Sequence, residues 1–347
     1  MNAQLDRPRR SHRPLASASH PPDAAGHRGL AAGRHRPCGP ARGAALLVAM
    51  VVLTVVATLA SGMVWQQWKA VQVEAAERGR VQSGWILNGA LDWARLILRE
   101  DARSGRATSL HEPWATPLAE ARLSTFLASD RDHSADAGPE AFLSGRIDDA
   151  QARYNLRNLL AEGKITPARL AVLERLCTSA GLSADTAALI GNRLLAAAMA
   201  DADDAPLMPQ TLADLVWLGV PEASVQALST LVVLLPVATP INLNTAPREV
   251  LAATIPGVDL GSADRLVQAR GRQPLRSLAE ATAVLGPGAT LEAAVVDVKS
   301  SFFEVHGRLR LADRVLQEQS LVERLSNLDV LVRSRRRESI LTAGLRN

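Results

Sequence analysis

The sequence predicts an α+β fold: a long N-terminal helix packed on a small antiparallel sheet, with a large all-α domain inserted between the strands. Three observations predict it. Apolar positions keep a helical period over residues 44–100, helical segments fill 148–298, and strand-like alternation returns after residue 299. The 347 residues, 47% hydrophobic and 21% charged, are enough for about two globular domains.

The first element is an apolar helix long enough to cross a membrane. Residues 44–68 contain no charged side chain, and at 1.5 Å per residue the transmembrane part, about 44–66, spans a bilayer core of roughly 30 Å. Trp65 and Trp68 stand where an interfacial aromatic belt would lie. The eight Arg of residues 1–43 predict that this side is cytoplasmic. We therefore expect a single-pass protein of a bacterial inner membrane with a periplasmic body.

The same helix is expected to continue well beyond the membrane. Apolar residues recur at helical spacing on one face, with a second apolar row beside them: Ile86, Ala90, Trp93 and Ile97, flanked by Leu87, Leu91, Ala94 and Leu98. One helix from 44 to 100 would be roughly 85 Å long. A simple anchor needs no such extension, whereas a subunit that bundles into a filament does.

A processing signal stands just before the apolar run. Arg42 and Gly43 precede the chain Ala44-Ala45-Leu46-Leu47-Val48, which resembles the site of a type IV prepilin peptidase. The resemblance implies cleavage between Gly43 and Ala44, methylation of Ala44, and loss of residues 1–43 as a basic leader. A plain signal anchor in which Gly43 is incidental is the alternative.

Composition and motifs argue against several classes of function. The chain has two cysteines, Cys38 and Cys177, and scattered histidines, so it offers neither a disulfide framework nor a cysteine-based zinc site. It contains no nucleophile elbow, P-loop or dinucleotide fingerprint, and no enzyme is expected. The positive charge belongs to residues 1–43 rather than to the body, which speaks against a nucleic-acid surface.

The body divides into five stretches. Residues 101–147 are expected to hold turns and the first part of the sheet, 148–237 a helical module, and 238–298 a second module that resembles a helix-hairpin-helix. The closing strands follow over 299–332, and 333–347 is expected to be a basic tail.

The second helical module carries the alternative function. Thr245 is a candidate helix N-cap, and the turn at 255–259 reads Ile-Pro-Gly-Val-Asp before a second helix. Nucleic-acid-binding hairpins usually place a second glycine where Asp259 stands, and a carboxylate there would repel phosphate. A membrane-anchored periplasmic protein for DNA binding or DNA uptake is therefore the alternative, and the expectation is that no nucleic acid binds.

Several segments together resemble one family. In order along the chain, the processing site, the run Asn88 to Ala94, the run Asp148 to Leu159, residues 241–251 and the closing strands resemble the K-type minor pseudopilin of type II secretion systems, also known as the general secretion pathway protein K family. The most specific parts are Asp-Ala-Gln-x-x-Tyr-Asn-Leu at 149–156 and Asn-Leu-Asn-Thr-Ala at 242–246. The resemblance covers nearly everything after residue 42.

The resemblance implies a role in protein transport. A K-type subunit starts or caps the pseudopilus at its tip together with I-type and J-type minor pseudopilins, so that folded exoproteins pass the outer-membrane secretin. Prepilin peptidase and the inner-membrane assembly platform are the further implied partners, and exoproteins and the secretin itself are candidates. Most pilin-like proteins carry Glu at the fifth mature position, here Val48, and the K-type subunit lacks it.

Calcium is the one cofactor that the resemblance raises. The family's helical domain has an acidic loop with Tyr and Pro that is associated with calcium, whereas this chain offers only Asp201, Asp203 and Asp204, before Pro206, as candidate ligands. As an EF-hand the loop fails, because Pro206 stands where glycine is needed. The sequence leaves calcium binding open, with a solvated acidic helix end as the alternative.

Overall fold

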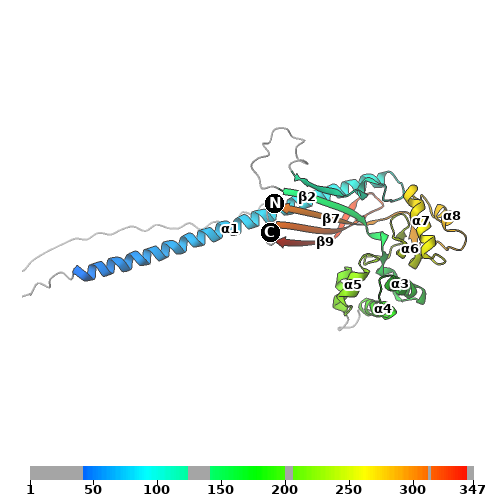
Figure 1. The fold of residues 1–347 in the computed structure, drawn as a ribbon, viewed down its shortest axis with the longest axis horizontal. Coiled ribbons are helices and arrows are strands. Elements are labelled where there is room, and N and C mark those ends of the chain that lie inside the picture. The colour runs from blue at the N-terminus through cyan, green and yellow to red at the C-terminus, as the bar shows by residue number, and fades with distance from the viewer. Residues whose placement is uncertain (1–41, 124–140, 200–205, 312–313, 342–347) are drawn as a thin grey trace, which may run out of the picture. The chain divides into compact units, whose positions relative to one another are not determined.

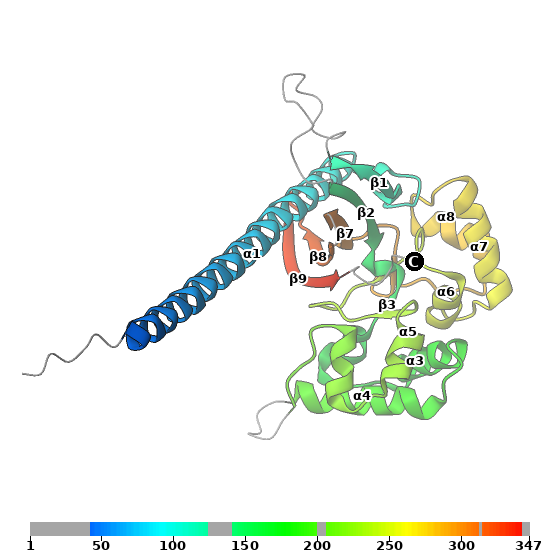
Figure 2. The same cartoon turned by 60° about the vertical axis from the view of Figure 1, so that its left-hand side comes forward.

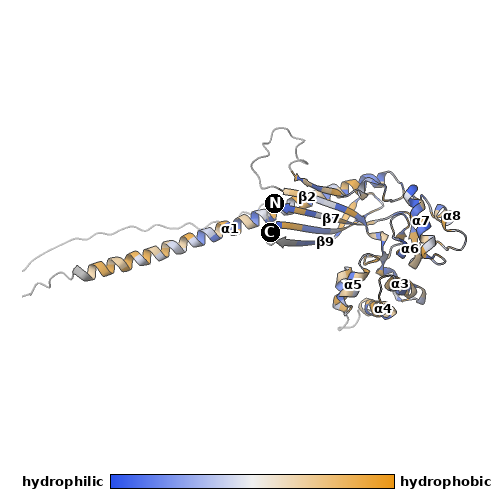
Figure 3. Cartoon of the chain, viewed as in Figure 1, coloured by the Kyte–Doolittle hydropathy of each residue, from blue (hydrophilic) through white to orange (hydrophobic). Residues whose placement is uncertain are grey.

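A computed structural model describes residues 42–123, 141–199, 206–311 and 314–341. The chain divides into two units, Met1–Ala70 and Val71–Asn347, which are described separately. Helix α1, Arg42–Arg103, contributes to both. In the first unit its apolar side chains from Leu46 to Trp68 are exposed, and Figure 3 shows this part of α1 as mostly hydrophobic.

The second unit is built around a five-stranded antiparallel sheet. Its strands are β1 (Leu118–Arg122), β2 (Ala141–Asp149), β7 (Phe302–Leu311), β8 (Arg314–Arg324) and β9 (Val330–Leu341), in the spatial order β1-β2-β7-β8-β9 (Figure 1; all five are labelled in Figure 2). A short 3-10 helix, η1 (Pro113–Ala115), precedes β1. The predicted α+β class, with a long N-terminal helix and an antiparallel sheet, is confirmed.

The later part of α1 packs against one face of this sheet. The buried row is Leu87, Leu91, Ala94 and Leu98, spaced so that all four point the same way. This row packs against alternate residues of the strands, among them Phe303 and Val305. Trp114 completes the layer, with its ring edge-on to that of Phe303 and 5.3 Å between the ring centres. The neighbouring row, which the sequence analysis named first, lies to the side of this contact: Ile86, Ala90, Trp93 and Ile97.

The helical insertion joins β2 to β7 as two modules. The first holds η2 (Ala150–Ala152), η3 (Leu156–Gly163), α3 (Pro167–Ser179), α4 (Ala184–Ala198), η4 (Leu212–Leu218) and α5 (Glu222–Leu228), and the second holds α6 (Arg248–Thr254), α7 (Leu260–Arg272) and α8 (Leu278–Leu285). Figure 2 shows α3 to α5 and α6 to α8 as two groups. One hydrophobic cluster runs through both, so they share a core.

Short parallel bridges join the two ends of each module. In the first module β3 (Tyr154–Asn155) pairs with β4 (Val232–Val233), and in the second β5 (Ile241–Asn242) pairs with β6 (Val296–Asp297). In each module the chain therefore leaves close to the point where it entered. β2 and β7 also pair directly, with Asp149 opposite Phe303, so the sheet is continuous across the insertion.

Two expectations differ from the structure. The segment 333–347 was expected to be a basic tail, but its described part, through Leu341, belongs to β9 and makes up most of that strand. Carboxylates on β8 pair with its arginines, for example Glu323 with Arg333, which makes an arginine-rich strand tenable. Thr245 is not a helix cap either, because α6 begins at Arg248 and the Thr245 hydroxyl is used elsewhere.

Candidate functional site

The predicted processing site lies at the start of α1. Arg42 is the first described residue of the helix, so Gly43 and Ala44 fall in its first turn. Val48 lies one turn further and is exposed. Cleavage after Gly43 and methylation of Ala44 stay predictions.

The first unit has the properties of a membrane anchor. Within the described residues one helix, Ala44–Arg103, is long and apolar enough to cross a membrane, with a mean hydropathy of 2.5 in its most apolar window. Nothing else in the described chain covers that window. Trp65 and Trp68 stack at 5.4 Å between ring centres, with the Lys69 ammonium 5.5 Å from the Trp65 ring. One apolar helix of this kind fits a single-pass inner-membrane anchor.

In the second unit, α1 has an apolar face that its own sheet leaves uncovered. Four large apolar side chains, all more than half exposed, follow one side of the helix at helical spacing: Val81, Trp85, Trp93 and Leu96. We call these four the outer stripe. Gly89 lies between the two tryptophans, and no atom lies within 4 Å of the position that a Cβ would take there. Exposed tryptophans in a row are typical of an interaction surface.

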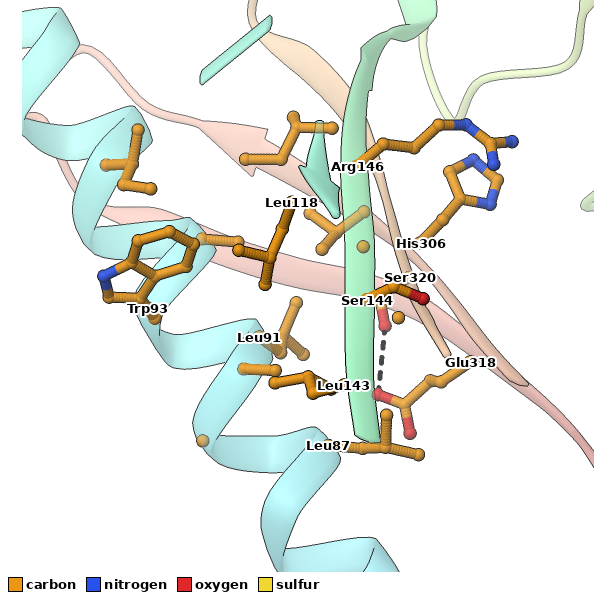
Figure 4. Close-up of a pocket in the computed structure, with 18 of the residues that line it drawn as sticks. Leu87, Leu91, Trp93, Leu118, Leu143, Ser144, Arg146, His306, Glu318 and Ser320 are labelled. Atoms are coloured by element: carbon orange, nitrogen blue, oxygen red, sulfur yellow. Dashed lines mark hydrogen bonds between the residues drawn. The ribbon is translucent and has the colours of Figure 1, made fainter. Parts of the chain in front are cut away.

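A cavity of about 480 Å³ lies beside the buried row of α1, between the helix and strands β1, β2 and β7 (Figure 4). Its walls are mainly apolar, with Leu87, Leu91 and Trp93 from α1 and Leu118 and Leu143 from the sheet. This volume is within the range of clefts that hold small ligands. Trp85 and Trp93 line the cavity and also belong to the outer stripe, so the two surfaces are continuous.

Two facing glycines line the cavity. Gly145 of β2 pairs in register with Gly307 of β7, and both line the space. The layers on either side are filled, by Leu143 with Leu309 and by Ile147 with Val305, whereas the strands contribute no side chain to this layer. Leu87 of α1 reaches part of it, with its Cδ2 3.2 Å from the position that a Cβ would take on Gly307. A Cβ on Gly145 would lie 2.8 Å from the backbone oxygen of His306, so a larger residue would force these strands apart.

A buried carboxylate stands at one end of the cavity. Glu318 of β8 is paired with two arginines of β9: its Oε2 accepts from Arg337 Nη2 at 2.5 Å, and its Oε1 lies 3.3 Å from Arg335 Nε. Arg335 also donates to Asn88 of α1 at 2.6 Å, and Ser320 donates to Glu318 at 3.4 Å (Figure 4). The charge of Glu318 is therefore already compensated inside the protein.

The two most specific sequence motifs meet where the helical insertion joins β2 and β7, and they are buried there rather than lining an open site. Asp149 Oδ2 accepts from Thr245 Oγ1 and Ser300 Oγ, each at 2.6 Å, and from Asn242 Nδ2 at 2.9 Å. Asp149 Oδ1 accepts from the Gln151 amide at 2.8 Å. All five residues are buried. The motifs are thus the two halves of one polar network.

The network fixes the points where the chain enters and leaves the helical insertion. The Gln151 side chain accepts from the backbone of Ser301 and donates to the Pro240 carbonyl, at 2.6 and 2.9 Å. Arg324 of β8 donates to the Ser300 carbonyl at 2.8 Å and pairs with Asp101 of α1 at 2.9 Å. Burial raises the pKa of Asp149, although its hydrogen bonds oppose that rise. This buried network is structural.

The helix-hairpin-helix does not present a free phosphate site. Gly257 has φ +79°, and a Cβ there would lie 2.0 Å from the Gly288 carbonyl oxygen, because the loop after α8 packs directly on the hairpin. The Pro256 carbonyl accepts from the Thr290 amide at 3.2 Å. Asp259 caps α7 by accepting from the Ser262 amide at 2.7 Å. The chain itself covers the turn that would approach a phosphate, which disfavours the DNA-binding alternative.

A charged cluster links the two central strands to the start of the insertion. His306 Nε2 lies 3.2 Å from Asp148 Oδ2 and 3.7 Å from Glu304, and Glu304 pairs with Arg153 at 2.7 Å. Burial opposes the charge of His306, but the proximity of the two carboxylates outweighs burial and raises its pKa. Figure 4 shows His306 and Arg146 on the side of β2 away from α1.

The acidic residues suggested for calcium, Asp201, Asp203 and Asp204, lie outside the described residues. Among the residues that are described, no group of three or more His, Cys, Asp or Glu side chains could hold a metal ion. Calcium binding at the acidic loop stays a prediction.

Sequence reasoning missed the cavity and the outer stripe. The signals in the sequence were two isolated glycines within strand-like runs and a tryptophan, Trp85, outside the two apolar rows of the helix. Strand register was needed to bring Gly145 opposite Gly307, and register cannot be obtained from either segment alone.

These features define a class: among the described residues, one helix that is long and apolar enough to cross a membrane continues onto an antiparallel sheet, as in pilin-like proteins. A family model described as type II secretion system protein K matches residues 241–299. Type II secretion system protein K of Pseudomonas aeruginosa is 28% identical over 302 residues, covering 78% of this chain and 85% of that protein.

A solved structure shares the fold. It is the crystal structure of the GspK-GspI-GspJ complex from the type 2 secretion system of enterotoxigenic Escherichia coli, with a TM-score of 0.57, 19% identity, and coverage of 76% of this chain and 98% of that one. The predicted resemblance to the K-type minor pseudopilin is confirmed, and the comparisons support a minor pseudopilin in type II secretion.

Proposed function

We propose that this chain is the minor pseudopilin at the tip of a type II secretion pseudopilus, where it starts or caps assembly and supports export of folded exoproteins through the outer-membrane secretin. The observation that carries the proposal is the nature of α1. The helix is uncharged over residues 44–68, and its outer stripe is uncovered in the second unit. A helix that is apolar where its own fold does not bury it is suited to assembly with other helices.

The tip position is supported by Val48. A carboxylate within the bilayer is costly unless it is paired, and in pilin-like proteins the fifth-position Glu can pair with the N-terminal amine of a subunit already assembled. A subunit with no neighbour ahead of it has no amine to meet. An apolar side chain such as valine avoids the cost of a carboxylate at this position in the bilayer.

The proposed partners are the I-type and J-type minor pseudopilins, the counterparts of GspI and GspJ in the Escherichia coli complex. Prepilin peptidase would remove residues 1–43, and the inner-membrane assembly platform would receive the mature chain with its body in the periplasm. Exoproteins and the secretin are further candidate partners. The proposed role is structural, without catalysis and without nucleic acid.

Maturation is tested by mass spectrometry of the full chain isolated from membranes of cells that contain prepilin peptidase. We expect an N-terminus at Ala44 carrying a methyl group. Gly43→Phe should leave residues 1–43 attached, because the peptidase requires a small residue before the cut. An intact leader on the wild-type chain would return it to the anchored-protein class.

A further inference from the structure

We propose that the cavity beside Gly145 and Gly307 receives a large apolar side chain from the helix of an adjoining pilin-like subunit. This inference rests on the proposed function and names the contact through which the neighbouring subunit is held.

The occupant must be apolar. The cavity is walled mainly by aliphatic and aromatic side chains of α1 and the sheet, and the facing glycines Gly145 and Gly307 contribute no side chain to it. Glu318 at its end does not call for a cation, because Arg335 and Arg337 already compensate it. A leucine or aromatic side chain would gain burial there without leaving a polar group unpaired.

The occupant is expected to arrive on a helix. Trp85 and Trp93 belong to both the outer stripe and the cavity wall, so an apolar surface continues along α1 from the stripe into the space. Gly89 leaves a gap between the two rings where another helix can approach the backbone of α1 closely. Ridges of one helix pack into such grooves of another, and a side chain beside the contact would then reach the cavity.

A filling variant tests the proposal. Ala90 lines the cavity from α1, so Ala90→Phe should occupy the space with the chain's own ring. We expect it to reduce at least tenfold the amount of I-type and J-type subunit recovered with the full chain from detergent-solubilised membranes. The matched control is Ala223→Phe, at an exposed position of α5, which should recover both partners as the wild type does.

Accessibility gives a second measurement that does not depend on a tolerated bulky ring. In a Cys38→Ser background the remaining Cys177 is buried, so a thiol introduced by Ala90→Cys can be labelled selectively with a maleimide. The introduced thiol should react with the maleimide in the isolated full chain, and its labelling rate should be at least tenfold lower in the complex. Protection already present in the isolated chain would mean that another part of this chain fills the cavity, and the proposal would be wrong.

The two levels of the hypothesis fail differently. If the wild-type chain recovers neither I-type nor J-type subunit, the proposed function fails and this inference with it. If the wild type recovers them while Ala90→Phe binds equally well and the introduced thiol stays reactive, only the cavity contact is refuted. If Ala90→Phe lowers the melting temperature, the thiol protection decides.

Discussion

Asp149 is the last residue of β2, and three stretches of chain converge on its carboxylate. The donors come from the first turn of the insertion, from the start of the second helical module and from the segment that returns to β7. Burial of a carboxylate is unfavourable, and four hydrogen bonds offset that cost. The arrangement is stabilising only while all members are present, since each donor is also buried.

Removing this carboxylate is therefore expected to be costly. Asp149→Ala leaves Asn242, Thr245 and Ser300 without their acceptor, and the free energy of unfolding should fall by about 2–4 kcal/mol. Asp264→Ala, which removes an exposed ion pair with Arg248, should change it by about 0.5 kcal/mol or less. Urea unfolding of the detergent-solubilised chain, followed by circular dichroism, measures both. Equal effects of the two variants would contradict the structural role of the network.

The cluster around His306 predicts a pH dependence with a definite sign. The pKa of His306 is raised above its ordinary value of about 6.5, so its pairing stabilises the fold below that pH and is lost as pH rises through the folded pKa. Asp148 and Glu304 behave oppositely. Burial works against their ionised forms, but His306 and the arginines Arg146 and Arg153 lower their pKa values, so their contribution is lost as pH falls below about 4.

His306→Asn should accordingly lower the melting temperature by about 2–4 °C at pH 5.5 and by much less at pH 9. The reason is that asparagine cannot carry the charge that Asp148 and Glu304 favour. The control is His111→Asn, whose imidazole lies 3.3 Å from the Gly271 carbonyl oxygen and forms no ion pair with a described residue, and it should lower the melting temperature at pH 5.5 by less than His306→Asn does. If His306→Asn lowers the melting temperature equally at both pH values, the packing of the His306 side chain and not its charge stabilises the fold.

Among the elements, α7 shows why a motif-like hairpin need not bind DNA. Asp259 occupies the position of the second glycine, where its carboxylate caps the helix, while Gly257 lets the turn contact the loop at Gly288. Both residues serve packing within the module.

Asp259→Gly restores the glycine-hydrophobe-glycine order and tests this interpretation. Stability should fall by only a few tenths of a kcal/mol, because glycine is a tolerable N-cap. DNA binding should not appear, since residues 288–290 still cover the turn. Fluorescence anisotropy with a short duplex at low salt is the measurement, with Ser262→Gly as a matched control. Micromolar binding by the variant would revive the DNA-uptake alternative.

Helix α1 also shows how far sequence predicts structure. Composition and periodicity predicted its length and its amphipathic part. Two adjacent apolar rows could each face the sheet, however, and periodicity cannot show which of them does. The sheet selects the row with Leu87 and Leu91, which leaves Trp93 half exposed beside the cavity. In the same way Thr245 fits a cap by local rules, yet a distant carboxylate, Asp149, takes its hydroxyl. Contacts between distant segments decided these cases.

In the second unit as a whole, the helical insertion interrupts the sequence of the sheet but not its hydrogen bonding. β2 and β7 pair without a break over nine residue pairs from Ala141↔Leu311 to Asp149↔Phe303. Because a hairpin would give the same pairing, the sheet with its α1 row should form without the insertion.

Replacing residues 150–302 with Asn-Gly tests this independence. The two residues suit a type I′ turn between Asp149 and Phe303, so the register of β2 and β7 is kept and Leu143 and Leu309 still face α1. We expect slow amide exchange in β7 and β8, with a lower melting temperature because the contacts of Thr108 with Val298 and Ser300 are lost. Replacing 150–303 instead shifts the pairing by one residue, which turns the apolar side chains of one strand to the opposite face and should abolish protection. If exchange is equally fast in both chains, the insertion supplies the stability of the sheet, and the helix-plus-sheet body is not an independent folding unit.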